Sequence, residues 1–220
     1  MSENGILFLT EKAMDSTQTK ILARMRRLGP GKVHVSKDFL DLGSRDAVDQ
    51  ALSRLVRDKS VRRLARGLYH IPKKNPTLGI ELPPDMDALA QAIARKTGSR
   101  IVPSGAVAAN WLGLSTQVPA KPVYLTDGKS RDLRVGNTMI SMRHISPRDL
   151  PLGSPESAMV FQALRYLGKD AMDDATVAKL RRKLTQARRR KLLKDVRYVT
   201  GWIAETVRKV CEEEKGAWMK

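Results

Sequence analysis

The clearest hydrophobic pattern of the chain lies between residues 44 and 59, where apolar residues recur every three or four positions. The apolar positions are Ala47, Val48, Ala51, Leu52, Leu55 and Val56. This spacing is typical of a helix with one buried side. Ser44 follows Gly43 and can cap the first turn with its hydroxyl. At about 1.5 Å of rise per residue, the stretch predicts an amphipathic helix about 24 Å long.

The segments around this helix give a definite order of elements. The pattern predicts a helix over residues 17–28, a short strand over residues 33–35, a short helix over residues 37–42 and a hairpin over residues 61–71. Gly67 stands where the hairpin must turn. This order favours a winged helix-turn-helix, in which the third helix reads a DNA groove and the hairpin, or wing, lies against the adjacent backbone.

The polar side of the long helix carries residue types that can read bases. Arginine and glutamine hydrogen-bond to base edges in the major groove, and we expect Arg45, Gln50 and Arg54 to do so. We expect Lys37 and Arg57 to meet phosphates. The candidate DNA-binding residues are Lys37, Ser44, Arg45, Gln50, Ser53, Arg54, Arg57, Arg62, Arg63 and Arg66. The simpler alternative is a small helical domain with a solvated basic face.

The remainder of the chain predicts a second domain behind a proline-rich connection. Helical patterns at residues 87–96 and 105–112 precede three strand-like runs, and the pattern is helical from residue 155 onward. The expected domains are a leader over residues 1–16, a winged helix-turn-helix over 17–75, a linker over 76–84 and an α+β domain over 85–220. The predicted fold class is therefore α+β and mostly helical, with a small antiparallel sheet and a helical bundle in the second domain.

The composition adds a strong positive charge to this picture. Hydrophobic residues make up 41% and charged residues 29% of the 220 residues, which is typical of a globular protein. The net charge is +18, an excess usually found on proteins that bind polyanions. Residues 17–75 hold 15 Lys and Arg against 5 Asp and Glu, a net +10, and residues 151–220 hold 16 against 9, a net +7. Charge alone does not separate DNA-binding from RNA-binding proteins.

A second group of basic residues lies near the C-terminus. A possible second polyanion-binding face consists of Arg182, Lys183, Arg189 and Arg190. A run of charges is more often a solvated surface, so both interpretations stay open at this point. If this face contacts phosphate, neutralising these residues should change how DNA binding depends on salt concentration.

An enzyme is poorly supported by the sequence. The chain has one cysteine, which excludes an internal disulfide, and its three histidines lie in separate predicted elements without metal-ligand spacing. A phosphate-binding glycine loop is absent, and Asp127 and Asp132 beside Lys129 would be the only basis for a nuclease. We expect no catalytic residue, no metal and no cofactor. Apolar runs are too short to span a membrane, and we expect a cytoplasmic protein.

Two separate blocks of the sequence resemble a known family. Residues 37–56 followed by 61–69, the latter reading VRRLARGLY, are similar to the winged domain of AbiEi-type antitoxins of type IV toxin–antitoxin systems. Residues 103–128, PSGAVAANWLGLSTQVPAKPVYLTDG, resemble the start of the second domain in a subgroup known only by a domain-of-unknown-function label. The resemblance covers roughly residues 17 to 200.

The resemblance implies a transcriptional regulator of a phage-defence system. It implies that the first domain represses its own operon by binding double-stranded DNA, at an operator expected to contain repeats. It implies that the second domain neutralises a nucleotidyltransferase-like toxin, for which a stable complex is not required. The alternatives are a basic RNA-binding or ribosome-associated protein and, with less support, a nuclease. The aromatic content of 5% argues against RNA recognition by base stacking.

Overall fold

A computed structural model describes residues 16–136 and 138–212 of the chain. The fold is α+β, and it divides into two compact units. Among the described residues, the first unit contains residues 16–99 together with 135 and 136, and the second contains residues 100–134 and 138–212. The predicted leader falls outside the described residues except for Ser16, which caps the first described helix by accepting a hydrogen bond from the Thr19 N–H.

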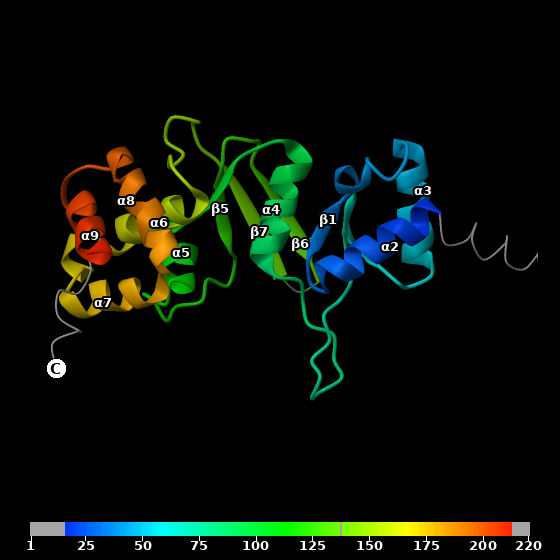
Figure 1. Cartoon of the computed structure of the whole chain (residues 1–220), viewed down its shortest axis with the longest axis horizontal. Coiled ribbons are helices and arrows are strands. Elements are labelled where there is room, and N and C mark those ends of the chain that lie inside the picture. The colour runs from blue at the N-terminus through cyan, green and yellow to red at the C-terminus, as the bar shows by residue number, and fades with distance from the viewer. Residues whose placement is uncertain (1–15, 137, 213–220) are drawn as a thin grey trace, which may run out of the picture. The chain divides into compact units, whose positions relative to one another are not determined.

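The first unit follows the order of elements that the hydrophobic pattern predicts. It contains α2 (Thr17–Leu28), β1 (Val33–Val35), the 3₁₀ helix η1 (Ser36–Phe39), α3 (Arg45–Arg57), β2 (Arg62–Ala65), β3 (Leu68–His70) and α4 (Met86–Thr97) (Figure 1). The short helix expected over residues 37–42 is only the 3₁₀ turn η1. Its start is fixed by Asp38, whose carboxylate accepts the Val35 N–H at 3.0 Å.

The core of the first unit is formed by the apolar sides of α2 and α3. Ile21, Met25, Val48 and Leu52 are completely buried there, together with Phe39 from η1. Full burial of a side chain of this size contributes about 1.5–3 kcal/mol. The same arrangement leaves the polar side of α3 outside the core, as its helical periodicity requires.

The hairpin β2–β3 belongs to a three-stranded antiparallel sheet with the order β1–β3–β2. The register shifts between Arg63 and Ala65, so a β-bulge twists the end of β2. Gly67 turns the chain at φ +72°, a conformation that a side chain would strain. Tyr69 and His70 are buried and attach the hairpin to the core.

Helix α4 belongs to the first unit, whereas the sequence placed it in the second domain. The Arg95 guanidinium donates to the Val33 carbonyl at 2.9 Å, and the Lys96 ammonium donates to the Arg66 carbonyl at 2.6 Å. These bonds join the basic C-terminal end of α4 to β1 and to the turn between β2 and β3. The structural division therefore falls near residue 100 and not in the expected linker over residues 76–84.

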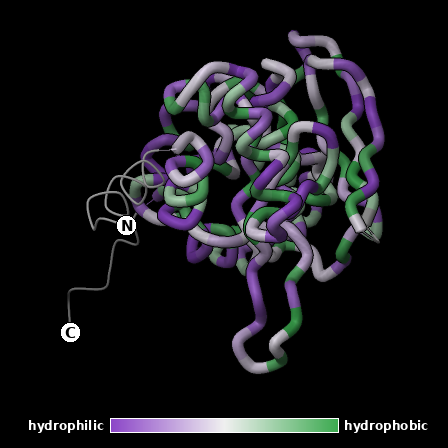
Figure 2. Tube along the Cα trace, turned by 90° about the vertical axis from the view of Figure 1, so that its right-hand side faces the viewer, coloured by the Kyte–Doolittle hydropathy of each residue, from purple (hydrophilic) through white to green (hydrophobic). Residues whose placement is uncertain are grey.

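The expected linker is itself folded. Residues 73–82 form a hairpin-like arm in which the Leu82 N–H donates to the Lys73 carbonyl at 2.7 Å and the Asn75 N–H donates to the Ile80 carbonyl at 2.8 Å. A β-bridge pairs Lys74 with Glu81 between these bonds. The arm extends away from the body of its unit (Figures 1 and 2). Its prolines prevent a helix, as expected, but backbone pairing orders the segment.

The second unit combines a four-stranded sheet with a helical bundle. Its elements are β4 (Ile101–Pro103), α5 (Gly105–Trp111), β5 (Val123–Thr126), β6 (Arg131–Val135), β7 (Thr138–His144), α6 (Pro155–Leu167), η2 (Lys169–Ala171), α7 (Asp174–Lys183), α8 (Gln186–Asp195), η3 (Val196–Tyr198) and α9 (Gly201–Cys211). The helices and strands expected from the pattern are all present, within a few residues of their predicted bounds.

The prediction of an antiparallel sheet is wrong for this unit. The strand order is β4–β5–β7–β6, with β4 antiparallel to β5 but β5 parallel to β7. Three consecutive strand-like runs suggest a meander, but β6 lies at the edge and β7 occupies the place beside β5. The sheet is therefore mixed, because the chain passes through the edge strand before it returns to the centre.

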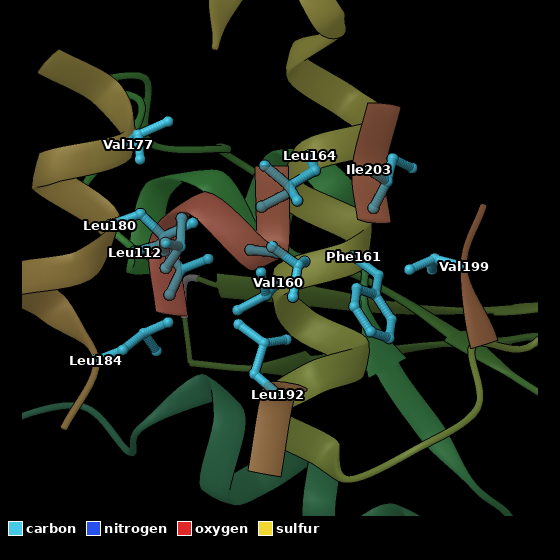
Figure 3. Packing of buried hydrophobic residues seen from close by; sticks show 14 of the residues in the cluster. Leu112, Val160, Phe161, Leu164, Val177, Leu180, Leu184, Leu192, Val199 and Ile203 are labelled. Carbon is cyan, nitrogen blue, oxygen red and sulfur yellow. The ribbon is translucent and has the colours of Figure 1, made fainter. Parts of the chain in front are cut away.

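The bundle has its own hydrophobic core around α6. Val160, Phe161 and Leu164 of α6 point into a cluster that also contains Leu180 of α7 and Leu192 of α8 (Figure 3). Helices α5 and α6 pack closely at Gly105. A Cβ atom on Gly105 would lie 2.3 Å from the Tyr166 Cβ, so only glycine fits there without a shift of the backbone.

Candidate nucleic-acid interface

The exposed side of α3 carries the predicted base-reading residues. Arg45, Gln50 and Arg54 are exposed, while Val48 and Leu52 on the opposite side have no accessible surface. Ser53 and Arg57 are exposed as well. Because the helix is held from its apolar side, its polar side chains are free to point outward from the unit.

Arg45 is held by an ion pair within the helix. Its Nε donates to the Asp49 Oδ2 at 2.8 Å, one turn further along α3, and 57% of its side-chain surface stays exposed. This hydrogen bond lowers the pKa of the Asp49 carboxyl, and a bond from the Ser36 hydroxyl lowers it further. The guanidinium is therefore oriented along the helix surface before any ligand arrives.

Ser44 has a structural role at the start of α3. Its Oγ accepts the Ala47 N–H at 3.3 Å, which satisfies one of the free donors in the first helical turn. The capping predicted from Gly43 and Ser44 is confirmed. The hydroxyl is exposed and can still donate a hydrogen bond outward.

The three arginines of the hairpin β2–β3 differ in how freely they project. Arg62, Arg63 and Arg66 are all exposed. Arg62 forms an ion pair with Glu81, with its Nη2 2.7 Å from the Glu81 Oε2, and the Arg63 Nε donates to the Ala65 carbonyl at 3.4 Å. The Arg66 backbone is fixed by Lys96, as described above. Of the three, Arg62 is the most committed to a partner within the protein.

Lys37 also has a hydrogen-bond partner within the unit. Its ammonium donates to the Lys96 carbonyl at the C-terminal end of α4, at 3.1 Å. A cation at this end of a helix is favoured by the helix dipole. The sequence predicts a phosphate contact at Lys37, and the structure adds this bond, which such a contact would have to share or replace.

Other charged residues position α3 without facing outward from it, and the sequence prediction missed them. Arg24 of α2 forms two parallel hydrogen bonds with the Asp41 carboxylate, at 2.7 and 2.6 Å, and a third with the Asp38 carbonyl. The Arg24 bond lowers the pKa of the Asp41 carboxyl. The pair ties α2 to the turn before α3. The only signal in the sequence is an arginine that lies one turn after Ile21 and directly before Met25.

Two histidines lie inside the first unit and are structural. His34 and His70 are buried, and burial lowers the pKa of both imidazoles below the ordinary value of 6.5. They are therefore neutral at neutral pH. Across residues 16–136 and 138–212, no group of His, Cys, Asp or Glu side chains is arranged to hold a metal ion.

A pocket of about 340 Å³ opens in the first unit between α2, β1, η1 and α4. Arg24 and Arg95 line it, but both guanidiniums are already bonded, to Asp41 and to the Val33 carbonyl. The pocket thus follows from the way α4 packs against β1. The outward face of α3 with its neighbouring hairpin remains the better candidate site.

Only some residues of the possible second basic face are exposed. Arg182, Lys183 and Arg190 are exposed, whereas Arg189 is half-buried. The Arg189 Nε is buried without a hydrogen-bond partner among the described residues, and its carbonyl accepts the thiol of Cys211 at 3.4 Å. Arg189 therefore packs against α9 and does not belong to an outward face with the other three.

The acidic residues that suggested a nuclease have structural partners. The Asp127 carboxylate accepts the Arg100 N–H at 2.7 Å. The Asp132 carboxylate accepts the Ser141 hydroxyl at 2.6 Å and the Lys121 ammonium at 2.9 Å. These bonds lower the pKa of the Asp132 carboxyl. Both carboxylates are thus explained by the fold of the second unit.

A comparison with models of protein families gives a match over most of the chain. The model of a family of unknown function, DUF6088, matches residues 20–192. No curated protein matches the chain. Within the described parts of the chain, every helix is too short or too polar to cross a membrane.

Proposed function

The chain belongs to the DUF6088 family of unknown function, and from the residues of its first unit we propose that it is a DNA-binding transcriptional regulator. One observation carries the proposal. Helix α3 buries its apolar side in the core and turns Arg45, Gln50 and Arg54 outward, in the same unit as a hairpin that bears three exposed arginines. In a winged helix-turn-helix these two elements meet the major groove and the backbone beside it.

The proposed mechanism assigns base reading to α3. Its thirteen residues make a rod of about 20 Å, which fits the major groove. The arginine guanidiniums would donate two hydrogen bonds to the O6 and N7 of guanine, and the Gln50 amide would pair with the N6 and N7 of adenine. To reach a base, Arg45 would exchange its exposed bond with Asp49. Exposed pairs contribute at most about 1 kcal/mol, so the exchange costs little.

The remaining basic residues would position the protein. Arg57 at the C-terminal end of α3 and Arg63 and Arg66 on the hairpin would meet phosphates or enter the minor groove, where arginine is favoured. Such contacts set affinity and register without reading sequence. They also make binding depend on salt concentration, because each neutralised phosphate releases counterions.

The base-reading assignment predicts a loss of specificity on substitution. Arg45→Ala or Gln50→Ala should each weaken binding to the specific site by about 1–3 kcal/mol and change binding to random duplex little, because only the specific site offers matching base edges. The site is first selected from random duplexes with the full-length protein, and affinities are then measured by fluorescence anisotropy.

A matched control separates this effect from loss of charge. Arg165→Ala removes one exposed arginine from α6 in the second unit and should leave both affinities unchanged. Equal losses on specific and random DNA would make Arg45 and Gln50 positioning residues. Tighter binding to RNA than to duplex DNA of the same sequence would favour the RNA-binding alternative and overturn the proposal.

We further propose that the regulator is the autorepressing antitoxin of a type IV toxin–antitoxin system. This finer assignment is supported by the resemblance of residues 37–69 and 103–128 to AbiEi-type antitoxins, and by no contact described above. The test is co-expression with a nucleotidyltransferase-like protein encoded beside it. The wild type should restore growth and repress its promoter, whereas Gln50→Ala should restore growth but lose repression. Failure of the wild type to restore growth would remove the antitoxin role alone.

A further inference from the structure

The arm formed by residues 73–82 is an ordered element without an evident role in the core. In addition to its backbone pairing, its turn is fixed by the Asn75 side chain, which accepts the Thr77 and Leu78 N–H groups at 2.9 and 3.1 Å. Gly79 then adopts φ +66°. A segment with this many local bonds has a defined shape, although it packs against little else.

The two sides of the arm differ in chemistry. Lys73 and Lys74 are exposed on the outgoing strand. Leu78 and Ile80, at the tip and on the returning strand, have 64% and 55% of their surfaces exposed. Figure 2 shows the arm extending from the body of the fold with hydrophobic positions near its tip. These two apolar side chains project into solvent at the end of an ordered element, where a partner could cover them.

The arm is attached to the strand that carries the hairpin arginines. Glu81 forms its ion pair with Arg62 of β2, and at the base of the arm the Gly31 N–H donates to the Ile71 carbonyl at 2.8 Å. Because Glu81 is used in this pair, the positive charges of Lys73 and Lys74 are not compensated by it. The register pairs Arg62 with His70, so the arm leaves the small sheet at the Arg62 end, opposite the turn that carries Arg66 and Gly67. The arm therefore adds two exposed lysines to the part of the sheet that carries Arg62.

We propose that this arm is a second DNA-contacting element, which binds the duplex on the Arg62 side of the hairpin β2–β3. The inference rests on the proposed DNA-binding function. Lys73 and Lys74 contact backbone phosphates, and Leu78 and Ile80 enter the minor groove against a base step. Apolar side chains used in this way partly unstack the step and bend the duplex.

A second copy of the chain fits the same surface less well. A stable interface buries about 800 Å² on each partner, far more than two side chains at the tip of an arm provide. Pairing two arms would also bring four lysine ammonium groups together, while the acid of each arm, Glu81, is already paired with Arg62. Phosphates supply the opposite charge, so charge complementarity favours DNA.

The lysines and the apolar tip have separate tests in the full-length protein. Lys73→Gln/Lys74→Gln should lower the affinity for duplex DNA and reduce the slope of log K against log salt by about 0.9 for each contact, or about 1.8 for both. Leu78→Ser/Ile80→Ser should lower the affinity about tenfold, as expected for loss of modest apolar burial, and leave the slope unchanged. It should also reduce the bend of the duplex, measured by gel mobility of permuted sites.

The possible outcomes separate the proposed role of the arm from the proposed DNA-binding function of the protein. The control Lys169→Gln/Lys194→Gln removes two exposed lysines from the second unit and should change neither quantity. Wild-type protein that fails to bind duplex DNA refutes the proposed function. Wild-type binding with no change in either arm variant overturns the arm alone. Loss of self-association in the Leu78 and Ile80 variant, seen by sedimentation with unchanged DNA affinity, would assign the tip to a second copy and also overturn it.

Discussion

At the scale of single residues, the pair of Arg45 and Asp49 shows how a base-reading face can carry an acid. Asp49 lies among basic side chains on α3, where a free carboxylate would repel phosphate. Its bond to Arg45 instead holds the guanidinium in one orientation and reduces the number of rotamers that binding must freeze. Without Asp49, the positive charge of Arg45 would be uncompensated, but its guanidinium would be less well oriented.

The two buried histidines predict that the stability of the fold depends on pH. The pKa values of His34 and His70 are lowered by burial, so the unfolded chain binds protons more readily than the folded one below about pH 6.5. The free energy of unfolding should therefore fall as the pH is lowered from about 7.5 toward 5.5. Proton NMR should show both imidazoles titrating below 6.5, and midpoints at or above that value would contradict the prediction.

The histidines also show what the sequence reveals about single residues. Their structural role was predictable, because neither has a ligand partner at metal-binding spacing. The pairing of Arg24 with Asp41 was not, because the two residues are 17 positions apart and belong to different elements. A single sequence contains no direct signal for such a contact.

At the scale of elements, Arg95 is one of the two basic residues whose hydrogen bonds hold the C-terminal end of α4. Arg95 donates to the Val33 carbonyl of a buried strand and lies 3.4 Å from the Asp38 carboxylate. Arg95→Ala leaves that carbonyl without its partner and should lower the free energy of unfolding by about 1 kcal/mol, near the low end of the range because Arg95 is partly exposed. Hydrogen exchange should show faster exchange in β1 and β3.

A neighbouring arginine provides the control for this prediction. Arg100→Ala removes a guanidinium that bonds the Pro151 carbonyl within the second unit. Exchange in β1 and β3 should be unchanged in that variant. If both substitutions accelerate the two strands equally, the bond from Arg95 has no special part in holding α4.

Local patterns predicted the elements well but not their partners. The period of apolar residues in α3 gives both its bounds and its exposed side, because a helix depends on neighbours in sequence. The bonds of Arg95 and Lys96 reach carbonyls 62 and 30 positions away, so α4 was assigned to the wrong unit. The arm over residues 73–82 was missed because lysines and proline, together with the prolines on either side of the arm, are also typical of a linker.

At the scale of the whole molecule, the basic side chains of the two units are not equally accessible to a polyanion. In the first unit most candidate DNA contacts are exposed side chains. In the second, Arg181 donates to the Val210 carbonyl at 3.2 Å and to the Lys209 carbonyl, and Arg189 packs beside Cys211. Part of the charge near the C-terminus therefore holds the end of α9 and cannot bind a polyanion without unfolding it.

This distribution predicts that the second unit contributes little to DNA affinity. Replacing Arg182, Lys183 and Arg190 together by glutamine should change the slope of log K against log salt by less than the value of about 0.9 expected for a single phosphate contact. The measurement is a salt titration of the full-length protein on its selected site. A reduction of about 2 to 3 would show that these residues form a second polyanion-binding face.

The mixed sheet of the second unit has a consequence for how the chain folds. Strands β5 and β7 run parallel, so their pairing cannot start from a tight turn, and β6 must first reach the outer edge. Pairing between segments that are distant along the chain is slow, because the entropy of closing the loop between them is lost before stabilising contacts form. Helix α5 packs on α6 across a still longer separation, at Gly105 and Tyr166, so we expect the contact between α5 and α6 and the central strand pair to be the slowest steps toward the native state.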